Sequence, residues 1–147
     1  HDATTRPLPV PRPDLIYARL LLAHLPDHGS IVAAWCDELA PGGRLLLDEV
    51  DAVETDDRVM RRYLDEVAIP VIARQGGTLL IGPELHAMDD PPGTTRVHDE
   101  VAALEPPVTL TARMFAMNLQ VLTASGETSR RPDLEEGLAA IERVAGI

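Results

Sequence analysis

Short apolar runs alternate with segments of helical period along the first third of the chain. The runs at 15–18 and 44–50 predict two short strands, the first of them buried on both faces. Between them, residues 27–40 repeat apolar side chains at helical spacing (Ile31, Trp35 and Leu39), with Asp27 or Ser30 as the cap. Strand, helix and strand within about 35 residues predict parallel strands joined by a right-handed crossover.

A longer helix is predicted to follow. Thr55, with acidic residues behind it, suits a helix start, and Pro70 should kink or end the helix before Gly76-Gly77 stop it. Its expected buried stripe consists of Val59, Met60, Tyr63, Leu64 and Val67.

The last part of the chain is broken by glycine and proline before it becomes helical again. We expect one short helix near 84–88 and a third strand over 95–104, which alternates weakly. A helix should run from Pro106-Pro107 to about Thr123, and a final one from Pro132 to Ala145 with Leu134, Leu138 and Ile141 inward. The order of elements predicts an α/β fold.

Composition and charge argue against several classes of function but do not identify one. A length of 147 residues suits one domain, and a net charge of −11 argues against a nucleic-acid partner. The apolar run 15–25 contains Arg19 and His24 and is too short for a membrane helix. Residues 1–13 do not resemble a signal peptide, and the single Cys36 fits a reduced, cytoplasmic setting.

Several short motifs occur in an order that is typical of one protein family. They are Asp2-Ala3, Asp14-Leu15-Ile16-Tyr17-Ala18-Arg19, His24-Leu25-Pro26-Asp27, and Pro41-Gly42-Gly43 before Arg44-Leu45-Leu46-Leu47. Together they resemble the class I S-adenosylmethionine-dependent methyltransferases. In that family an Asp-Ala pair follows the third strand, the Asp-Leu-aromatic segment is the fourth strand, and Pro-Gly-Gly leads into the fifth.

One family feature is missing. None of the ten glycines forms the Gly-x-Gly of the family's cofactor loop. By the resemblance, residues 1–147 are a single domain that is a fragment of the methyltransferase domain. Residues 1–75 would be the later βαβ core of a partial Rossmann-like sheet, and 76–147 the acceptor-side strand and helices, with a helical insertion near the C-terminus. We expect this part alone to bind the cofactor weakly.

The resemblance implies cofactor contacts in the first part of the chain. Asp2, with Ala3, would meet the adenine of S-adenosylmethionine, although a solvated terminal Asp is an equal alternative. Ala18 and Arg19 would lie beside the methionine part, at the carboxyl end of a parallel strand. A structural Arg19 paired with Asp48 or Glu49 is the alternative.

Catalytic and acceptor candidates come from several segments. His24 has the chemistry of a general base near neutral pH, but a structural histidine packed at the helix start is the competing interpretation. Glu49 follows the second strand and could orient the acceptor, or simply hydrogen-bond the strand end. Met114, Met117 and Asn118 could line an acceptor site, although a methionine-rich stripe is more often core.

No metal site is predicted. His28, His86 and His98 lack metal-ligand spacing, and Ala18-Arg19 stand where the metal-dependent branch of the family has an aspartate. The functional hypothesis is methyl transfer from S-adenosylmethionine to a small-molecule acceptor. The alternative is a non-catalytic, methyltransferase-like interaction or dimerisation module. Expected partners are the acceptor and either a second copy or the missing N-terminal half, with no nucleic acid and no membrane.

Overall fold

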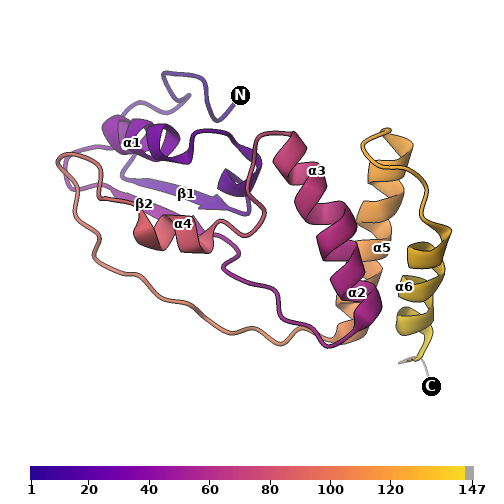
Figure 1. The fold of residues 1–147 in the computed structure, drawn as a ribbon. Helices are drawn as coiled ribbons and strands as arrows, with labels where there is room; N and C mark the ends of the chain where they lie inside the picture. The colour runs from indigo at the N-terminus through magenta and orange to yellow at the C-terminus, as the bar shows by residue number, and fades with distance from the viewer. Residues whose placement is uncertain (145–147) are drawn as a thin grey trace. The chain divides into compact units, whose positions relative to one another are not determined.

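A computed structural model describes residues 1–144, which fall into two compact units (Figure 1). Unit 1 comprises 1–52 and 75–101, and unit 2 comprises 53–74 and 102–144. The helix expected to begin at Thr55 is thus grouped with the C-terminal helices. The expectation of one domain with parts 1–75 and 76–147 stays a prediction.

Unit 1 is built on a parallel β-α-β arrangement, as predicted. Strand β1 (Leu15–Arg19) pairs in parallel with β2 (Arg44–Asp48), and α1 (His28–Glu38) connects them. The register places Leu15 opposite Arg44 and Arg19 opposite Asp48. Gly42, with a φ of 78°, provides the turn into β2, as the Pro-Gly-Gly sequence indicated. Ile31 N–H donates to the Asp27 carbonyl, but neither Asp27 nor Ser30 caps α1 with its side chain.

The two strands are buried on one face only, so the prediction that the 15–18 strand is buried on both faces was wrong. Along β1 the covered positions are Ile16 and Ala18, whereas Leu15 and Tyr17 are exposed. In β2 the same alternation leaves Leu46 exposed. Two strands carry too few neighbouring elements to cover both faces, which is the requirement behind continuous apolar runs.

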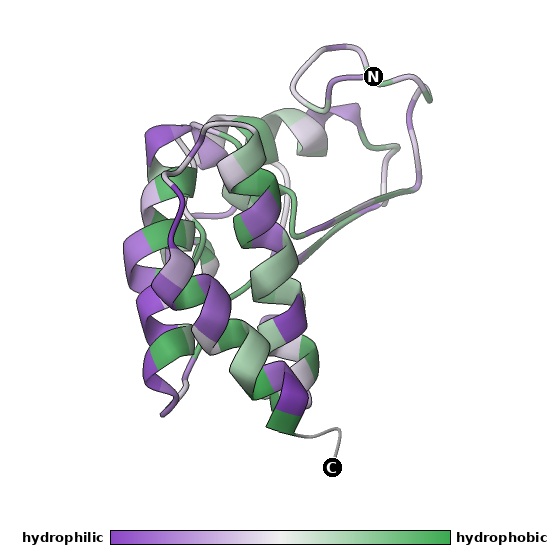
Figure 2. Ribbon diagram, turned by 90° about the vertical axis from the view of Figure 1, so that its right-hand side faces the viewer, coloured by the Kyte–Doolittle hydropathy of each residue, from purple (hydrophilic) through white to green (hydrophobic). Residues whose placement is uncertain are grey.

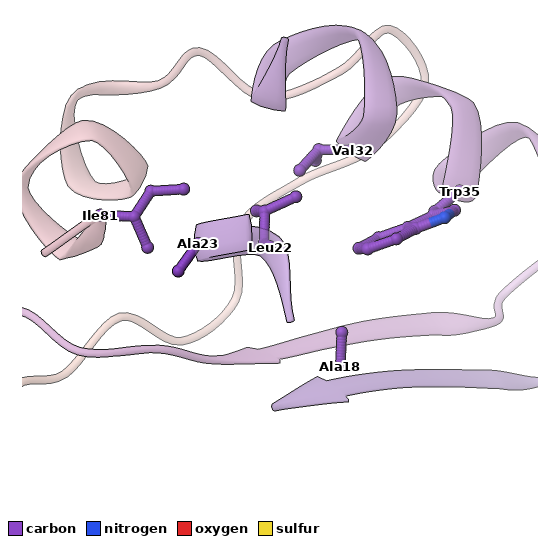
Figure 3. Close-up of a cluster of buried hydrophobic side chains, with 6 residues drawn as sticks. All are labelled: Ala18, Leu22, Ala23, Val32, Trp35 and Ile81. Carbon is purple, nitrogen blue, oxygen red and sulfur yellow. The ribbon is translucent and has the colours of Figure 1, made fainter. Parts of the chain in front are cut away.

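The core of unit 1 lies between the covered sheet face and α1. Figure 3 shows Ala18 pointing from β1 toward Trp35 and Val32 of α1, with Leu22 and Ala23 of the short 3-10 helix η1 (Leu22–His24) alongside. Ile81 completes this cluster and is fully buried. It directly precedes α4 (Gly82–Ala87), which agrees with the short helix predicted near 84–88.

Segment 95–104 is not a strand, which corrects the prediction of a third strand there. The structure assigns these residues no regular element, and Val97, Val101 and Leu104 are exposed. Arg96 holds the start of this segment against α4, because its guanidinium donates to the carbonyls of Leu85 and Met88 at 2.9 and 2.8 Å. It thereby adds a donor to the Leu85 carbonyl, which also accepts from Met88 N, and satisfies the carbonyl of the C-cap residue Met88.

Unit 2 is a bundle of three helical segments. The first runs without a break through α2 (Arg58–Tyr63), the π-helical turn η2 (Leu64–Ala68) and α3 (Ile69–Arg74). It packs with α5 (Val108–Ala124) and α6 (Pro132–Val144). Purple and green residues alternate along these helical ribbons in Figure 2. The predicted end of the last helix at Ala145 lies outside the described residues.

The first helix of unit 2 differs from its prediction at two places. The N-cap is Asp57, whose Oδ1 accepts from Val59 N and Met60 N, while Thr55 Oγ1 accepts from Asp57 N. Pro70 lies inside the helix instead of ending it. Proline cannot donate the usual helical hydrogen bond, and the π-helical turn directly before it changes the local pairing, with Ile69 N–H bonded to the Leu64 carbonyl.

The bundle is held by an apolar core and an ion network. Tyr63 stacks on Phe115 with ring centroids 4.5 Å apart, and Leu134 and Leu138 are fully buried. The buried stripe predicted for the first helix is confirmed by Met60, Tyr63, Leu64 and Val67, with Val59 partly buried. Burial raises the pKa of the Tyr63 phenol, and the neighbouring Asn118 side chain partly offsets this rise.

Four charged side chains join the first helix to the start of α6. Arg62 binds Glu66 at 2.8 Å and Asp133 at 2.7 Å, and Arg131 also contacts Glu66. Hydrogen bonds first from Arg62 and then from Arg131 lower the pKa of Glu66 to about 2.

Candidate functional site

The carboxyl-terminal edge of the parallel pair β1-β2 is the candidate site. In open α/β sheets, ligands bind in the crevice outside this edge. Arg19 and Asp48 end the two strands, and Glu49 follows β2 directly. The structure therefore brings Arg19 and Glu49, two of the residues predicted for the site, to the same edge.

Glu49 organises the turn that follows β1. Its Oε1 accepts from Leu21 N at 2.9 Å and from Leu22 N at 2.8 Å. Between β1 and these amides, Leu20 has a φ of 50°, a left-handed conformation that is strained for a bulky side chain. Leu20 N also donates to the Asp48 carbonyl at 3.0 Å. The carboxylate and the β2 backbone together hold a strained turn in place at the edge.

The second carboxylate oxygen of Glu49 is available for a further interaction. Oε2 is buried and has no hydrogen-bond partner within residues 1–144. A buried acceptor without a partner is uncommon in folded proteins, and it is a place where a ligand donor would be favoured.

Arg19 points away from the covered core and pairs with Asp48. Its Nε lies 3.3 Å from Asp48 Oδ2, and the same oxygen accepts from the Tyr17 hydroxyl at 3.1 Å. Desolvation, followed by the hydrogen bond to Asp48, raises the pKa of the Tyr17 phenol. Ala18 differs from Arg19, because its side chain is buried in the core of unit 1.

Ala3 is anchored to α1, whereas Asp2 is bonded within the N-terminal segment. The Trp35 indole Nε1 donates to the Ala3 carbonyl at 2.9 Å. Asp2 Oδ1 accepts from both the backbone N and the hydroxyl of Thr4, at 2.8 and 2.7 Å, and these bonds lower the pKa of the Asp2 carboxyl. Asp2 itself is exposed, and its Oδ2 makes no hydrogen bond within residues 1–144.

His24 ends η1 and is exposed. Within the described chain its ring makes no hydrogen bond or ion pair, while its backbone N donates to the Leu21 carbonyl at 3.1 Å. The remaining candidates, Met114, Met117 and Asn118, belong to α5 in unit 2 and are exposed. They line an open hollow of about 250 Å³ together with Leu110 and Arg113.

Sequence reasoning missed a polar cluster around α4. His86 Nδ1 lies 2.6 Å from Asp99 Oδ1, and His86 Nε2 lies 3.3 Å from Asp51 Oδ1. Arg96 donates to Asp99 at 2.7 Å, and this bond is the first cause of the lowered pKa of the Asp99 carboxyl. Asp51, His86 and Asp99 come from separate segments of the chain, so no sequence spacing predicts that they meet. The cluster ties α4 to the segment after β2.

A second missed contact joins buried His28 of α1 to exposed Glu84 of α4. His28 Nδ1 lies 2.7 Å from Glu84 Oε1, and His28 is 6% exposed. Its Nε2 has no hydrogen-bond partner within residues 1–144. Across the same residues, no cluster of three or more histidine, cysteine or acidic side chains is arranged to hold a metal ion. None of the helices described is long and apolar enough to cross a membrane.

The described residues form an α/β arrangement with a candidate ligand edge at the ends of two parallel strands. Comparison with known proteins finds two short matches. The chain is 49% identical over 41 residues to methyltransferase str2 of Strobilurus tenacellus, a match covering 28% of this chain and 15% of that protein. It is 41% identical over 59 residues to a trans-aconitate 2-methyltransferase of Methylobacterium nodulans, covering 40% of this chain and 23% of that protein.

Both matches are to methyltransferases and are consistent with the class I S-adenosylmethionine-dependent type. They cover less than a quarter of each relative's length. No family model matches the chain, and no solved structure matches it.

Proposed function

We propose that this chain is part of a methyltransferase that moves a methyl group from S-adenosylmethionine to a small-molecule acceptor. The observation that carries the proposal is the strained turn at the carboxyl end of β1, held by Glu49, in a chain with two methyltransferase relatives. Strained backbone that its surroundings hold in place is concentrated at ligand sites. A partial Rossmann-like sheet, of which β1-α1-β2 is one unit, is the fold we propose for it.

Residues at this edge, and Asp2 of the N-terminal segment, have chemistry that fits the proposed cofactor. When bound, S-adenosylmethionine would supply an electrophilic methyl group on a positively charged sulfonium. Asp2 has an oxygen free to accept from an adenine amino group, and the unpartnered Oε2 of Glu49 suits a donor or a positive charge. Arg19, exposed beside Ala18, would meet the polar end of the ligand in this proposal.

In this proposal the chain positions the acceptor and provides charged side chains for methyl transfer. Holding the acceptor in line with the methyl group supplies much of the rate in such a reaction, because the partners no longer have to find each other by diffusion. Where the acceptor is a hydroxyl, a base must take its proton, and His24 has a ring free of intramolecular partners within residues 1–144.

Titration calorimetry with S-adenosylhomocysteine, the demethylated product, tests this proposal. The natural full-length gene product should bind, and Asp2→Ala should weaken binding roughly tenfold, the effect of losing about 1.4 kcal/mol from one hydrogen bond. Asp37→Ala, an exposed change on α1, is the matched control and should bind as the parent does. Equal binding by both variants would remove Asp2 from the site.

The alternative proposal is a non-catalytic interaction or dimerisation module. The bare face of the β1-β2 sheet and the exposed methionines of α5 favour it. Absence of binding by the full-length product, with its fold intact by circular dichroism, would support the module over the enzyme.

A further inference from the structure

Helix α5 has two apolar faces, and only one of them faces its own bundle. Ala112, Phe115 and Leu119 form the buried face. On the opposite side, Leu110, Met114, Met117 and Val121 are 60%, 50%, 57% and 66% exposed. A helix that is apolar on opposite faces is normally covered on both. We name these four exposed residues the outer stripe.

The spacing of the outer stripe is that of a coiled-coil seam. Its members are separated by four, three and four residues, which is the d-a-d-a pattern of a heptad repeat. The stripe spans about 17 Å of helix at 1.5 Å per residue. Arg113 is the single charged residue among the 17 of α5, so this side of the helix carries almost no charge to keep another apolar surface away.

The stripe is self-complementary when two copies run antiparallel. With the two-fold axis passing between Phe115 and Ala116, Leu110 of one copy lies opposite Val121 of the other, and Met114 lies opposite Met117. Each a position therefore meets a d position, as antiparallel seams require.

The flanking polar residues agree with the same register. On one side of the seam Arg113 falls next to Gln120 of the second copy, whose amide oxygen can accept from the guanidinium. On the other side Asn118 falls next to Thr111. Equivalent arginines are offset by five residues, about 7.5 Å along the axis, so they do not oppose each other directly, and each lies 3.8 Å from Glu142 of its own chain.

We infer that the outer stripe of α5 is the seam of an antiparallel homodimer, in which a second copy of this chain covers Leu110, Met114, Met117 and Val121. This inference does not depend on methyl transfer. The hollow lined by Met114, Met117 and Asn118 is then closed by the partner copy and is not an acceptor site. Four apolar residues per copy make a small interface, so we expect dissociation constants on the order of 10–100 µM.

Sedimentation equilibrium from low micromolar to near-millimolar concentration tests the inference. The parent chain should shift from monomer to dimer over this range, and the double variant Met114→Glu and Met117→Glu should stay monomeric because four carboxylates would meet at the seam. Val108→Glu places one carboxylate on an exposed apolar residue of α5 outside the stripe and should dimerise as the parent does. A parent chain that stays monomeric throughout, or glutamate variants that dimerise equally well, would overturn the inference.

A pair of oppositely charged variants distinguishes loss of dimerisation from loss of folding. The chain with Met114→Lys and Met117→Lys should be monomeric alone and should form a heterodimer when mixed with the double glutamate chain. Unfolded variants would not recover association on mixing. Failure of the two folded variants to associate would count against the seam.

Cysteine cross-linking fixes the direction of the two helices. In a Cys36→Ala background, a Leu110→Cys chain mixed with a Val121→Cys chain should form the mixed disulfide on mild oxidation. Leu110→Cys alone should cross-link poorly, because its two copies would lie about 17 Å apart along the seam. Efficient cross-linking of Leu110→Cys to itself would indicate a parallel pair and contradict the proposed register.

Discussion

Replacing Glu49 by alanine should loosen the edge of the sheet without touching the apolar core. The change removes the acceptor for two backbone N–H groups. Leu21 is 37% exposed, so its amide can bond water, whereas Leu22 is fully buried and its amide would lose a charge-assisted bond. Such a bond contributes about 1.5–3 kcal/mol. We therefore expect the free energy of unfolding of unit 1 to fall by about 2 kcal/mol.

The chain has a built-in reporter for this measurement. Trp35 is the single tryptophan, is 3% exposed and lies in the core of unit 1. Urea unfolding followed by its fluorescence should show the loss for Glu49→Ala and about half of it for Glu49→Gln, which keeps a neutral acceptor. Asp37→Ala, at an exposed position of α1, should change the free energy by less than about 0.5 kcal/mol. A Glu49→Ala chain as stable as the parent would refute the view that this carboxylate holds the turn.

Three further predictions address other parts of the chain. Gly82→Ala should destabilise unit 1 by about 1–3 kcal/mol in the Trp35 assay, because a Cβ there would lie 2.4 Å from a backbone atom of Asp51; Gly29→Ala, with open space around it, should not. Leu20→Gly should be about 0.5–1 kcal/mol more stable than Leu20→Ala in the same assay, since glycine relieves the left-handed strain; equal stability would contradict it. The pKa of Glu66 is lowered in the folded state. Its contribution to the stability of unit 2 is therefore present above the unfolded-state pKa near 4.5 and is lost as pH falls toward 2. The protection factors of amides in α5 and α6, which compare each observed exchange rate with the intrinsic rate at the same pH, should therefore fall over that window, and Glu66→Gln should flatten the fall; an unchanged profile in Glu66→Gln would exclude this ion network as the cause.

Local chemistry was sufficient to predict most elements. Pro41-Gly42-Gly43 before an apolar run predicted β2 and its turn, and the helical spacing of residues 108–124 and 132–144 predicted α5 and α6. These signals depend on neighbouring residues, so they need no knowledge of the rest of the fold.

The errors arose where distant residues decide the outcome. Segment 95–104 alternates like a strand, but a strand needs a paired edge, and Arg96 is instead bonded to the end of α4. The role of Glu49 as an acceptor for the turn after β1 depends on the register of two strands, which the sequence pattern does not contain. The alternative considered for Arg19, a pair with Asp48, is seen in the structure.

The direct test of the proposed methyltransferase function is calorimetric titration of the natural full-length gene product with S-adenosylhomocysteine. The account predicts saturable binding that Asp2→Ala weakens roughly tenfold while Asp37→Ala leaves it unchanged. A folded full-length product that takes up no S-adenosylhomocysteine at any concentration would contradict the account.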